Sequence, residues 1–306
     1  MMSALVLTAG LGTRLDPLTR LVAKPAVPVA GQALGERVLR WLAREGVTDL
    51  VLNLHHLPHT ITGLIGDGAA YGLRVRYSWE RELLGSAGGP RHALSLLNSD
   101  PFLIVNGDTL TDVALAPLFD AHARSGADVT MVVIPNPATD RYNGVIADDD
   151  RIVRGFIPKG HAGSSWHFVG IQVVSQRVFA RLPDNTPAET VREIYRDLVS
   201  ASPGRVRVWP VTAPFHDVGT PEDYRAMCAK FDGLDACGNV IWPDATVAPG
   251  AQLTGCTVAG RIDVPATLSA RGVIVVPRSV VRPGDRCSTA GDLALFAIAP
   301  SGPPVA

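Results

Sequence analysis

A glycine-rich stretch near the N-terminus is the part of this sequence best suited to binding phosphate. It runs from Gly10 to Arg14 and directly follows an apolar run at residues 4–9. Glycines in such a loop leave backbone N–H groups open, and these donate hydrogen bonds to phosphate oxygens. Arg14 and Lys24 would add fixed positive charge over a polyphosphate. The stretch lacks both the Gly-Lys-Ser/Thr of a Walker A loop and the third glycine of a dinucleotide-binding loop.

An acidic residue after a second apolar run could hold a metal ion. Residues 102–105 are apolar, and Asn106, Gly107 and Asp108 follow them. A carboxylate at the carboxyl end of a buried parallel strand lies where open α/β sheets bind their ligands. Mg²⁺ prefers oxygen ligands. We therefore expect Asp108 to bind Mg²⁺.

Strands alternate with helices over the first 232 residues, and this pattern positions both motifs. Apolar runs typical of strands lie at 4–9, 50–54, 102–105, 129–134 and 168–174, and helical periodicity lies at 34–45, 87–97, 114–124, 189–200 and 221–231. Such alternation indicates an α/β, Rossmann-like domain with a mixed, mostly parallel sheet covered on both faces. We assign residues 1–232 to this domain.

The composition changes after about residue 235, where Val, Pro, Gly and Ala dominate. Ile241, Val247 and Leu253 recur every six residues. A branched apolar residue at this period, followed by small residues, is typical of a parallel β-helix. We expect a short, degenerate, left-handed β-helix over residues 238–290, and the alternative is an irregular β tail. Residues 299–306 are expected to be a disordered tail.

The overall composition excludes several classes of protein. Of 306 residues, 46% are hydrophobic and 19% are charged, and the formal net charge is -1. A disordered chain would be less apolar. A protein that binds the phosphates of a nucleic acid would be basic. No apolar run is long enough to span a membrane, and the N-terminus lacks the basic start of a signal peptide. We expect a cytoplasmic protein whose four cysteines are reduced, without nucleic-acid or membrane partners.

The N-terminal stretch, read as a whole, resembles the signature of a known family. Residues 7–19 read LTAGLGTRLDPLT, and residues 24–31 read KPAVPVAG. They are similar to the nucleoside-diphosphate-sugar pyrophosphorylases, or sugar-1-phosphate nucleotidyltransferases, and look closest to their mannose-1-phosphate guanylyltransferase-like members. The resemblance continues to about Phe231. It implies an enzyme that joins a nucleoside triphosphate to a sugar 1-phosphate, releases pyrophosphate and supplies nucleotide sugars for cell-envelope polysaccharides.

The resemblance assigns roles to residues in four segments. In the family, the glycine loop and its arginine hold the triphosphate, the lysine approaches the α-phosphate, and a segment matching residues 77–89 contacts base and ribose. The nucleotide-binding residues so implied are Leu7, Ala9, Gly10, Gly12, Thr13, Arg14, Lys24, Glu80, Gly85, Ser86, Ala87, Asn106 and Gly107. Residues 215–224 resemble a segment that carries a second magnesium ligand, here Asp217. The implied catalytic residues are Arg14, Lys24, Asp108 and Asp217, with Mg²⁺ held by the two aspartates.

The sugar site matches the family less well. The resemblance implies that the sugar phosphate is bound by Asn143, Gly144, Lys159 and Gly170. Pro158 and Gly160 stand where the family has Glu and Pro. A hydrogen-bond acceptor for a sugar hydroxyl is therefore missing from its usual place.

Glu80 falls where the family places its base-reading residue. A carboxylate suits the N1–H and N2 amino group of guanine, so we expect GTP with mannose 1-phosphate or a heptose 1-phosphate. Glu80 could equally accept from N3–H of uracil or thymine, or be solvated. The alternative is therefore UTP or dTTP with glucose 1-phosphate or an amino-sugar phosphate such as N-acetylmuramate 1-phosphate.

A non-catalytic regulatory subunit with the same fold is the alternative from another class. Retention of both carboxylates and both phosphate-side cations favours the enzyme. Transfer of this kind depends on positioning and charge neutralisation, and an ionised sugar phosphate needs no general base. We expect the β-helix to pack on the catalytic domain or to join subunits into a homo-oligomer.

Overall fold

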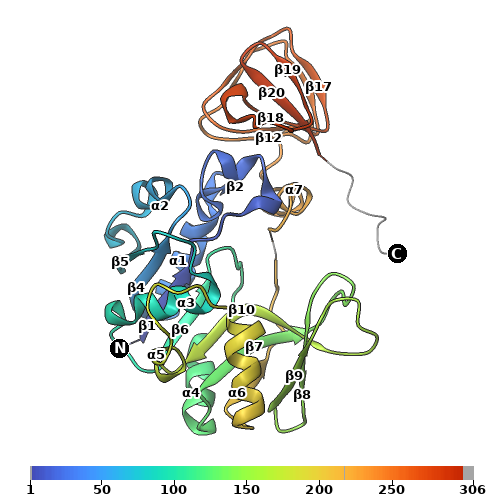
Figure 1. Ribbon diagram of the computed structural model, residues 1–306. Coiled ribbons are helices and arrows are strands. Elements are labelled where there is room, and N and C mark those ends of the chain that lie inside the picture. The colour runs from blue at the N-terminus through green and yellow to red at the C-terminus, as the bar shows by residue number, and fades with distance from the viewer. Residues whose placement is uncertain (1, 217, 299–306) are drawn as a thin grey trace. The chain divides into compact units, whose positions relative to one another are not determined.

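The computed structural model describes residues 2–216 and 218–298, and the chain divides into two compact units (Figure 1). Unit 1 comprises Met1–Gly10 and Arg37–His216, and unit 2 comprises Leu11–Glu36 and Asp217–Ala306. The predicted domain boundaries, 1–232 and 238–290, follow sequence order and stay predictions. The tail predicted at 299–306 lies outside the described residues.

A mixed sheet forms the centre of unit 1. Its strands are β1 (Met2–Leu7), β4 (Val47–Leu54), β5 (Arg74–Trp79), β6 (Phe102–Asn106), β7 (Val129–Pro135), β8 (Gly144–Ala147), β9 (Val153–Ile157), β10 (Trp166–Val174) and β11 (Val206–Pro210). The order is β11-β7-β10-β6-β1-β4-β5, and the β8–β9 hairpin joins at β10. β10 is antiparallel to β6 and β7, whereas the other neighbours on this path are parallel. The predicted mixed, mostly parallel sheet is confirmed.

The central strands of the sheet are buried on both faces, as their apolar runs predict. Ala4, Leu5 and Val6 in β1 have no exposed surface although successive side chains point to opposite faces. On one face, Leu5 and Ile104 pack into an apolar cluster that includes Tyr195. This packing fixes the strand ends that carry the predicted site residues.

The helices of the described residues are α1 (Leu34–Arg44), α2 (Pro58–Ile65), α3 (Gly85–Ala93), α4 (Leu115–Ser125), α5 (Arg177–Ala180), α6 (Tyr195–Ala201) and α7 (Pro221–Lys230). A helix is present at each of the five predicted ranges, with local differences in two of them, whereas α2 and α5 were not predicted. The helix predicted at 87–97 begins at Gly85 and finishes as a 3₁₀ turn. The helix predicted at 189–200 opens with a π-helical turn, η6 (Thr190–Ile194), and continues as α6. Such π turns are frequent at functional sites.

The C-terminal strands of unit 2 form three parallel ladders. The strands are β12 (Val240–Ile241), β13 (Thr246–Val247), β14 (Gln252–Thr254), β15 (Thr257–Val258), β16 (Asp263–Val264), β17 (Ser269–Arg271), β18 (Val273–Pro277), β19 (Cys287–Ala290) and β20 (Leu293–Ala297). β12, β15 and β18 pair in parallel, as do β13 with β16 and β14 with β17. These ladders are consistent with the predicted β-helix. After β18 the pairing becomes antiparallel, through β20 to β19.

Helix α7 ties these ladders to residues 11–36 within unit 2. The Tyr224 hydroxyl donates to the Pro28 carbonyl at 2.7 Å and accepts from Trp242 Nε1 at 2.9 Å. Thr220 and Asp223 form a capping box at the start of α7, as the sequence predicts. None of the helices in residues 2–216 and 218–298 combines the length and apolar character that a bilayer crossing requires.

Candidate active site

The glycine loop in unit 2 is folded tightly against Thr19 and Lys24. Gly12 has a positive φ of 64°, and a Cβ added there would lie 2.8 Å from Thr19 Cγ2 and 3.3 Å from Lys24 Cβ. The Thr19 hydroxyl also donates to the Gly12 carbonyl at 3.0 Å. A side chain at position 12 would therefore push the lysine away from the loop. Gly12 and Lys24, predicted from separate parts of the signature, lie together in the structure.

Asp16, Arg20 and Asp285 hold Thr19, and so the loop, in place. Asp16 accepts from the Thr19 hydroxyl at 2.8 Å and from Arg20 Nε at 2.9 Å. The other end of the Arg20 guanidinium pairs with Asp285, which precedes β19. The Arg20 and Asp285 side chains are only 10% and 14% exposed. The hydrogen bond from Arg20 lowers the pKa of the Asp285 carboxyl, and Asp285 raises the pKa of Arg20, so both groups stay charged.

The residues that lead into the loop belong to unit 1 and are anchored by neighbouring strands. The Leu7 carbonyl accepts from the Gly107 N–H at 3.0 Å. The Thr8 N–H donates to the Asn53 side chain at 2.7 Å, and the Thr8 hydroxyl donates to the Asn53 carbonyl. Three parallel strands, β1, β4 and β6, therefore end at one edge, where α/β sheets bind ligands.

The turn that carries Asp108 is packed against a bulge in β10. Gly170 has a positive φ of 81°, and a Cβ there would overlap the Asn106 side chain and lie 3.0 Å from Thr109 Oγ1. The Thr109 hydroxyl donates to the Val169 carbonyl at 3.1 Å. Gly170, predicted as a sugar contact, is thus placed beside the predicted metal-binding turn. Asp108 itself is half-buried.

The segment leading to Asp217 runs beside this turn. Leu110 and His216 form an isolated antiparallel bridge. Asp217 lies outside the described residues, so its predicted role as a metal ligand stays a prediction. A half-buried carboxylate at the end of β6 fits Mg²⁺, because this ion usually takes one or two protein carboxylates and fills its other positions with phosphate oxygens and water. In the described part of the chain, no group of three or more His, Cys, Asp or Glu side chains could hold a metal by itself.

Glu80 is buried, and its carboxylate is already bound within the chain. The residue is 5% exposed. One carboxylate oxygen accepts from Asn53 Nδ2 at 2.7 Å, and the other accepts from the Leu84 N–H at 2.9 Å. The solvated alternative is wrong, because Asn53 and Leu84 replace water. Base reading by Glu80 stays a prediction, and it would have to compete with these two bonds.

The glycines of the second motif make room for another part of the chain. A Cβ at Gly85 would lie 2.7 Å from the Ala188 carbonyl oxygen, and one at Gly88 would overlap the Thr186 carbonyl oxygen. The Ala87 N–H donates to the same Ala188 carbonyl at 2.9 Å. Gly85 and Gly88 therefore make room for residues 186–189, which lead into η6.

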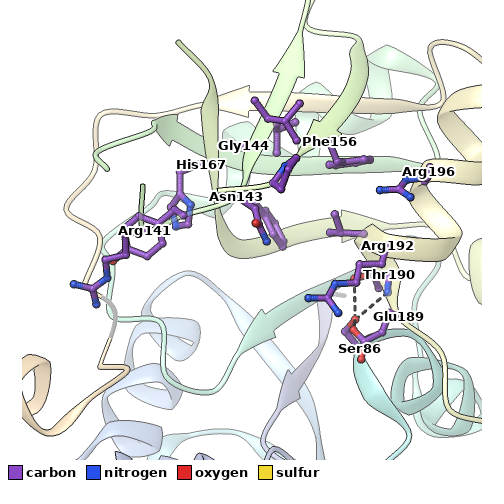
Figure 2. A pocket seen from close by; sticks show the side chains of 16 residues that line it. Ser86, Arg141, Asn143, Gly144, Phe156, His167, Glu189, Thr190, Arg192 and Arg196 are labelled. Atoms are coloured by element: carbon purple, nitrogen blue, oxygen red, sulfur yellow. Dashed lines mark hydrogen bonds between the residues drawn. The ribbon is translucent and has the colours of Figure 1, made fainter. Parts of the chain in front are cut away.

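A cavity of about 570 Å³ opens in unit 1 beside this contact (Figure 2). It falls within the range of about 300–1,000 Å³ that is typical of ligand pockets. Its walls come from β8, β9, β10 and the η6–α6 segment, and its lining residues are Ser86, Arg141, Tyr142, Asn143, Gly144, Val145, Phe156, Ile157, Pro158, His167, Phe168, Glu189, Thr190, Val191, Arg192 and Arg196. Asn143 and Gly144, which were predicted to bind the sugar phosphate, are both among these lining residues, and that role stays a prediction. Lys159 is exposed and is not among the lining residues, although its N–H donates to the Asn143 side chain at 3.0 Å.

An aromatic cluster on one side of the cavity contains a histidine that stays neutral. The His167 ring lies 4.4 Å from that of Tyr142 and 4.9 Å from that of Phe215. Burial lowers the pKa of His167 to about 4, and a weaker approach to the Asn143 backbone opposes this in part. Neither ring nitrogen makes a hydrogen bond of normal geometry within the described residues. An uncharged, unsatisfied imidazole can donate to or accept from a sugar hydroxyl.

Several of these residues were missed by the sequence reasoning. Arg192 and Arg196 lie four residues apart on the helix predicted at 189–200, and that spacing is the signal that points to a shared face. Asn53 is a polar residue at the end of an apolar run, which also marks a strand end near a site. His167 carries no such signal, because its burial depends on strands far apart in the sequence.

The sequence is similar to a known protein family and to several curated proteins. A protein-family profile described as "Nucleotidyl transferase" matches residues 3–232. Mannose-1-phosphate guanylyltransferase of Mycobacterium tuberculosis is 30% identical over 268 residues, which cover 84% of this chain and 75% of the relative. N-acetylmuramate alpha-1-phosphate uridylyltransferase of Neisseria meningitidis is 34% identical over 181 residues, or 58% of this chain and 77% of the relative.

A solved structure has the same fold. The crystal structure of HddC from Yersinia pseudotuberculosis superposes with a TM-score of 0.67 at 24% identity, over 76% of this chain and 100% of that one. The profile match covers most of the chain, and the match to the mannose-1-phosphate guanylyltransferase covers 84% of this chain and 75% of the relative. The chain therefore belongs to the nucleotidyl transferase family and is a sugar-1-phosphate nucleotidyltransferase.

Proposed function

We propose that this enzyme transfers GMP from GTP to a manno-type sugar 1-phosphate and releases pyrophosphate. We choose GTP because 84% of the chain is covered by its match to a mannose-1-phosphate guanylyltransferase. Glu80 no longer supports it, because both of its carboxylate oxygens are bound by Asn53 and Leu84.

In this proposal, the triphosphate lies over the loop from Gly10 to Arg14. Gly12 lets the backbone come close to Lys24, whose ammonium group stabilises charge that develops on the α-phosphate. Lys159 binds the phosphate of the sugar. An oxygen of that phosphate attacks the α-phosphorus, the bond to the β-phosphate breaks, and pyrophosphate leaves with its electron pair.

Asp108 and Asp217 are the residues that would hold Mg²⁺. When bound, the ion would neutralise phosphate charge at the point of attack. The close packing of Asn106 and Thr109 on Gly170 holds the Asp108 turn in place before substrates arrive. Positioning of this kind accounts for much of the rate of phosphoryl and nucleotidyl transfer.

The second candidate is transfer of UMP from UTP to an amino-sugar 1-phosphate. The observation that favours it is the 34% identity to an N-acetylmuramate alpha-1-phosphate uridylyltransferase, although this covers only 58% of the chain. Pyrophosphate release should be measured with GTP, UTP, dTTP and ATP, each against a panel of sugar 1-phosphates. We expect turnover with GTP, and turnover with UTP alone would replace the first proposal with the second.

A further inference from the structure

Two arginines line the cavity of unit 1 without a partner of their own. Arg192 belongs to η6 and Arg196 to α6, and both extend from that side toward the cavity (Figure 2). Within residues 2–216 and 218–298, neither guanidinium has a hydrogen bond or an ion pair. Residues four apart are neighbours on a helix, so the two positive charges repel each other. A bound anion would remove that repulsion.

The acidic side chains of the same segment, Glu189 and Glu193, accept hydrogen bonds from other groups. Glu189 accepts from the Ser86 hydroxyl at 2.7 Å. Glu193 accepts from the backbone N–H of Glu189 at 3.3 Å. Both carboxylates keep their negative charge, and Glu189 also lines the cavity. The lining nevertheless carries three arginines, Arg141, Arg192 and Arg196, against this one acidic residue, so an excess of positive charge faces a ligand.

The phosphate at C1 of the sugar does not account for this charge. That phosphate has to reach the α-phosphate of the nucleotide, which the proposed function places at Asp108 and the end of β6. Neither the turn from Asn106 to Asp108 nor Lys159 is among the residues that line the cavity. The arginine pair therefore faces a part of the acceptor away from C1.

We propose that Arg192 and Arg196 bind a second acidic group of the acceptor, so that the preferred substrate is a sugar 1-phosphate with a carboxylate or a phosphate ester away from C1. This inference rests on the proposed function and names a substituent of its acceptor. Guanidinium groups match both anions with paired N–H donors. The Tyr142 and Phe156 rings also line the cavity and provide apolar surface for the sugar ring.

Steady-state kinetics with matched pairs of acceptors test the inference. The pairs are N-acetylglucosamine and N-acetylmuramate 1-phosphate, glucose and glucuronate 1-phosphate, and mannose 1-phosphate and mannose 1,6-bisphosphate. The first two pairs test a carboxylate, and the third tests a phosphate ester. We expect kcat/KM to favour the acidic member of at least one pair by about 10- to 100-fold, as charge-assisted hydrogen bonds would give.

The variant R192Q/R196Q should lower the ratio of acidic to neutral kcat/KM about ten-fold or more, whatever the absolute rates. R192K/R196K keeps the charge and should retain a preference for the acid, which also covers the case that the glutamine variant fails to fold. Arg154→Gln is the matched control, because Arg154 pairs with Asp148 in the β8–β9 turn and should leave the ratio unchanged.

Two results would overturn the inference while leaving the proposed function intact. Equal kcat/KM for both members of every pair would show that no second acid is recognised. An equal loss on acidic and neutral members in R192Q/R196Q would show that the arginines bind the phosphate at C1. Turnover with UTP and none with GTP would instead refute the proposed nucleotide, and the ratio test would then be run with UTP.

Discussion

The Arg20 guanidinium joins Asp16, two residues after the glycine loop, to Asp285 of the C-terminal part of unit 2. It donates to Asp16 at 2.9 Å and to Asp285 at 3.0 Å, and its side chain is only 10% exposed. Asp16 in turn binds Thr19, which contacts Gly12. The loop that is proposed to hold the triphosphate is therefore supported by a residue 265 positions beyond Arg20.

Asp285→Asn should weaken triphosphate binding without removing any group that touches the nucleotide. Loss of the charge loosens Arg20 and, through Asp16, the loop around Gly12. We expect KM for the triphosphate to rise several-fold, kcat to change less, and the thermal midpoint to fall. Asp263→Asn changes an exposed aspartate of β16 and is the control. An unchanged KM in Asp285→Asn would show that the loop does not depend on this contact.

Gly170→Ala should damage both stability and catalysis. A positive φ costs a non-glycine residue about 1–2 kcal/mol, and the new Cβ would also overlap the Asn106 side chain. The turn that carries Asp108 must then shift, so we expect kcat to fall along with the thermal midpoint.

Gly126→Ala separates these two effects. Gly126 has a similar φ of 64° but no atoms within 4 Å of the added Cβ, so it reports the backbone cost alone. Thermal unfolding and kcat should be measured for both variants. If both lose the same stability and neither loses activity, the contact between position 170 and Asn106 is not important for the site.

Glu80→Gln should destabilise the protein and leave its choice of nucleotide unchanged. The amide would present N–H donors to Asn53 Nδ2 or to the Leu84 N–H, and a buried donor would lose its acceptor. We expect a loss of about 1–3 kcal/mol in the free energy of unfolding. Glu82→Gln, at an exposed position nearby, is the control. A changed ratio of GTP to UTP turnover in Glu80→Gln would restore its role in reading the base.

His167 should make the stability depend on pH in the acidic range. Its pKa is about 4 in the folded protein, against 6.5 in an unfolded chain. Below pH 6.5 the unfolded chain therefore binds a proton that the folded protein does not, and stability falls until about pH 4. His167→Gln should remove about 1–3 kcal/mol of that loss, which urea unfolding at pH 7 and pH 5 would detect. The same pH dependence in both proteins would contradict the assignment.

The parts of the fold that could be predicted depend on local pattern. The apolar run at residues 4–9 predicts β1 because a strand buried on both faces needs continuous apolar residues. Ile241, Val247 and Leu253 recur every six residues and lie in β12, β13 and β14, which are three successive strands of the β-helix-like region. This recurrence therefore predicts the parallel ladders. The antiparallel insertion of β10 between β6 and β7 could not be predicted, since strand order is set by packing between distant segments.

The site follows the same division. Gly12 and Lys24 could be predicted because both belong to the signature within residues 7–31. The partners of Glu80 could not, because Asn53 lies in another strand and its side chain approaches Glu80 only in the folded sheet. Arg192 and Arg196 also form no ion pair because the Glu189 and Glu193 side chains bond to other groups within the described residues. The spacing of these residues in the sequence does not determine the directions in which the glutamate side chains point.

The turnover of Asp108→Asn tests the central claim most directly, namely that nucleotidyl transfer occurs at the end of β6. Pyrophosphate release should be measured with Mg²⁺, GTP and the preferred sugar 1-phosphate. Asp112→Asn, at an exposed position four residues on, is the control. We predict that kcat falls at least about 100-fold in Asp108→Asn with an unchanged thermal midpoint, because one carboxylate at the point of transfer is lost. Full activity of this variant would contradict the account.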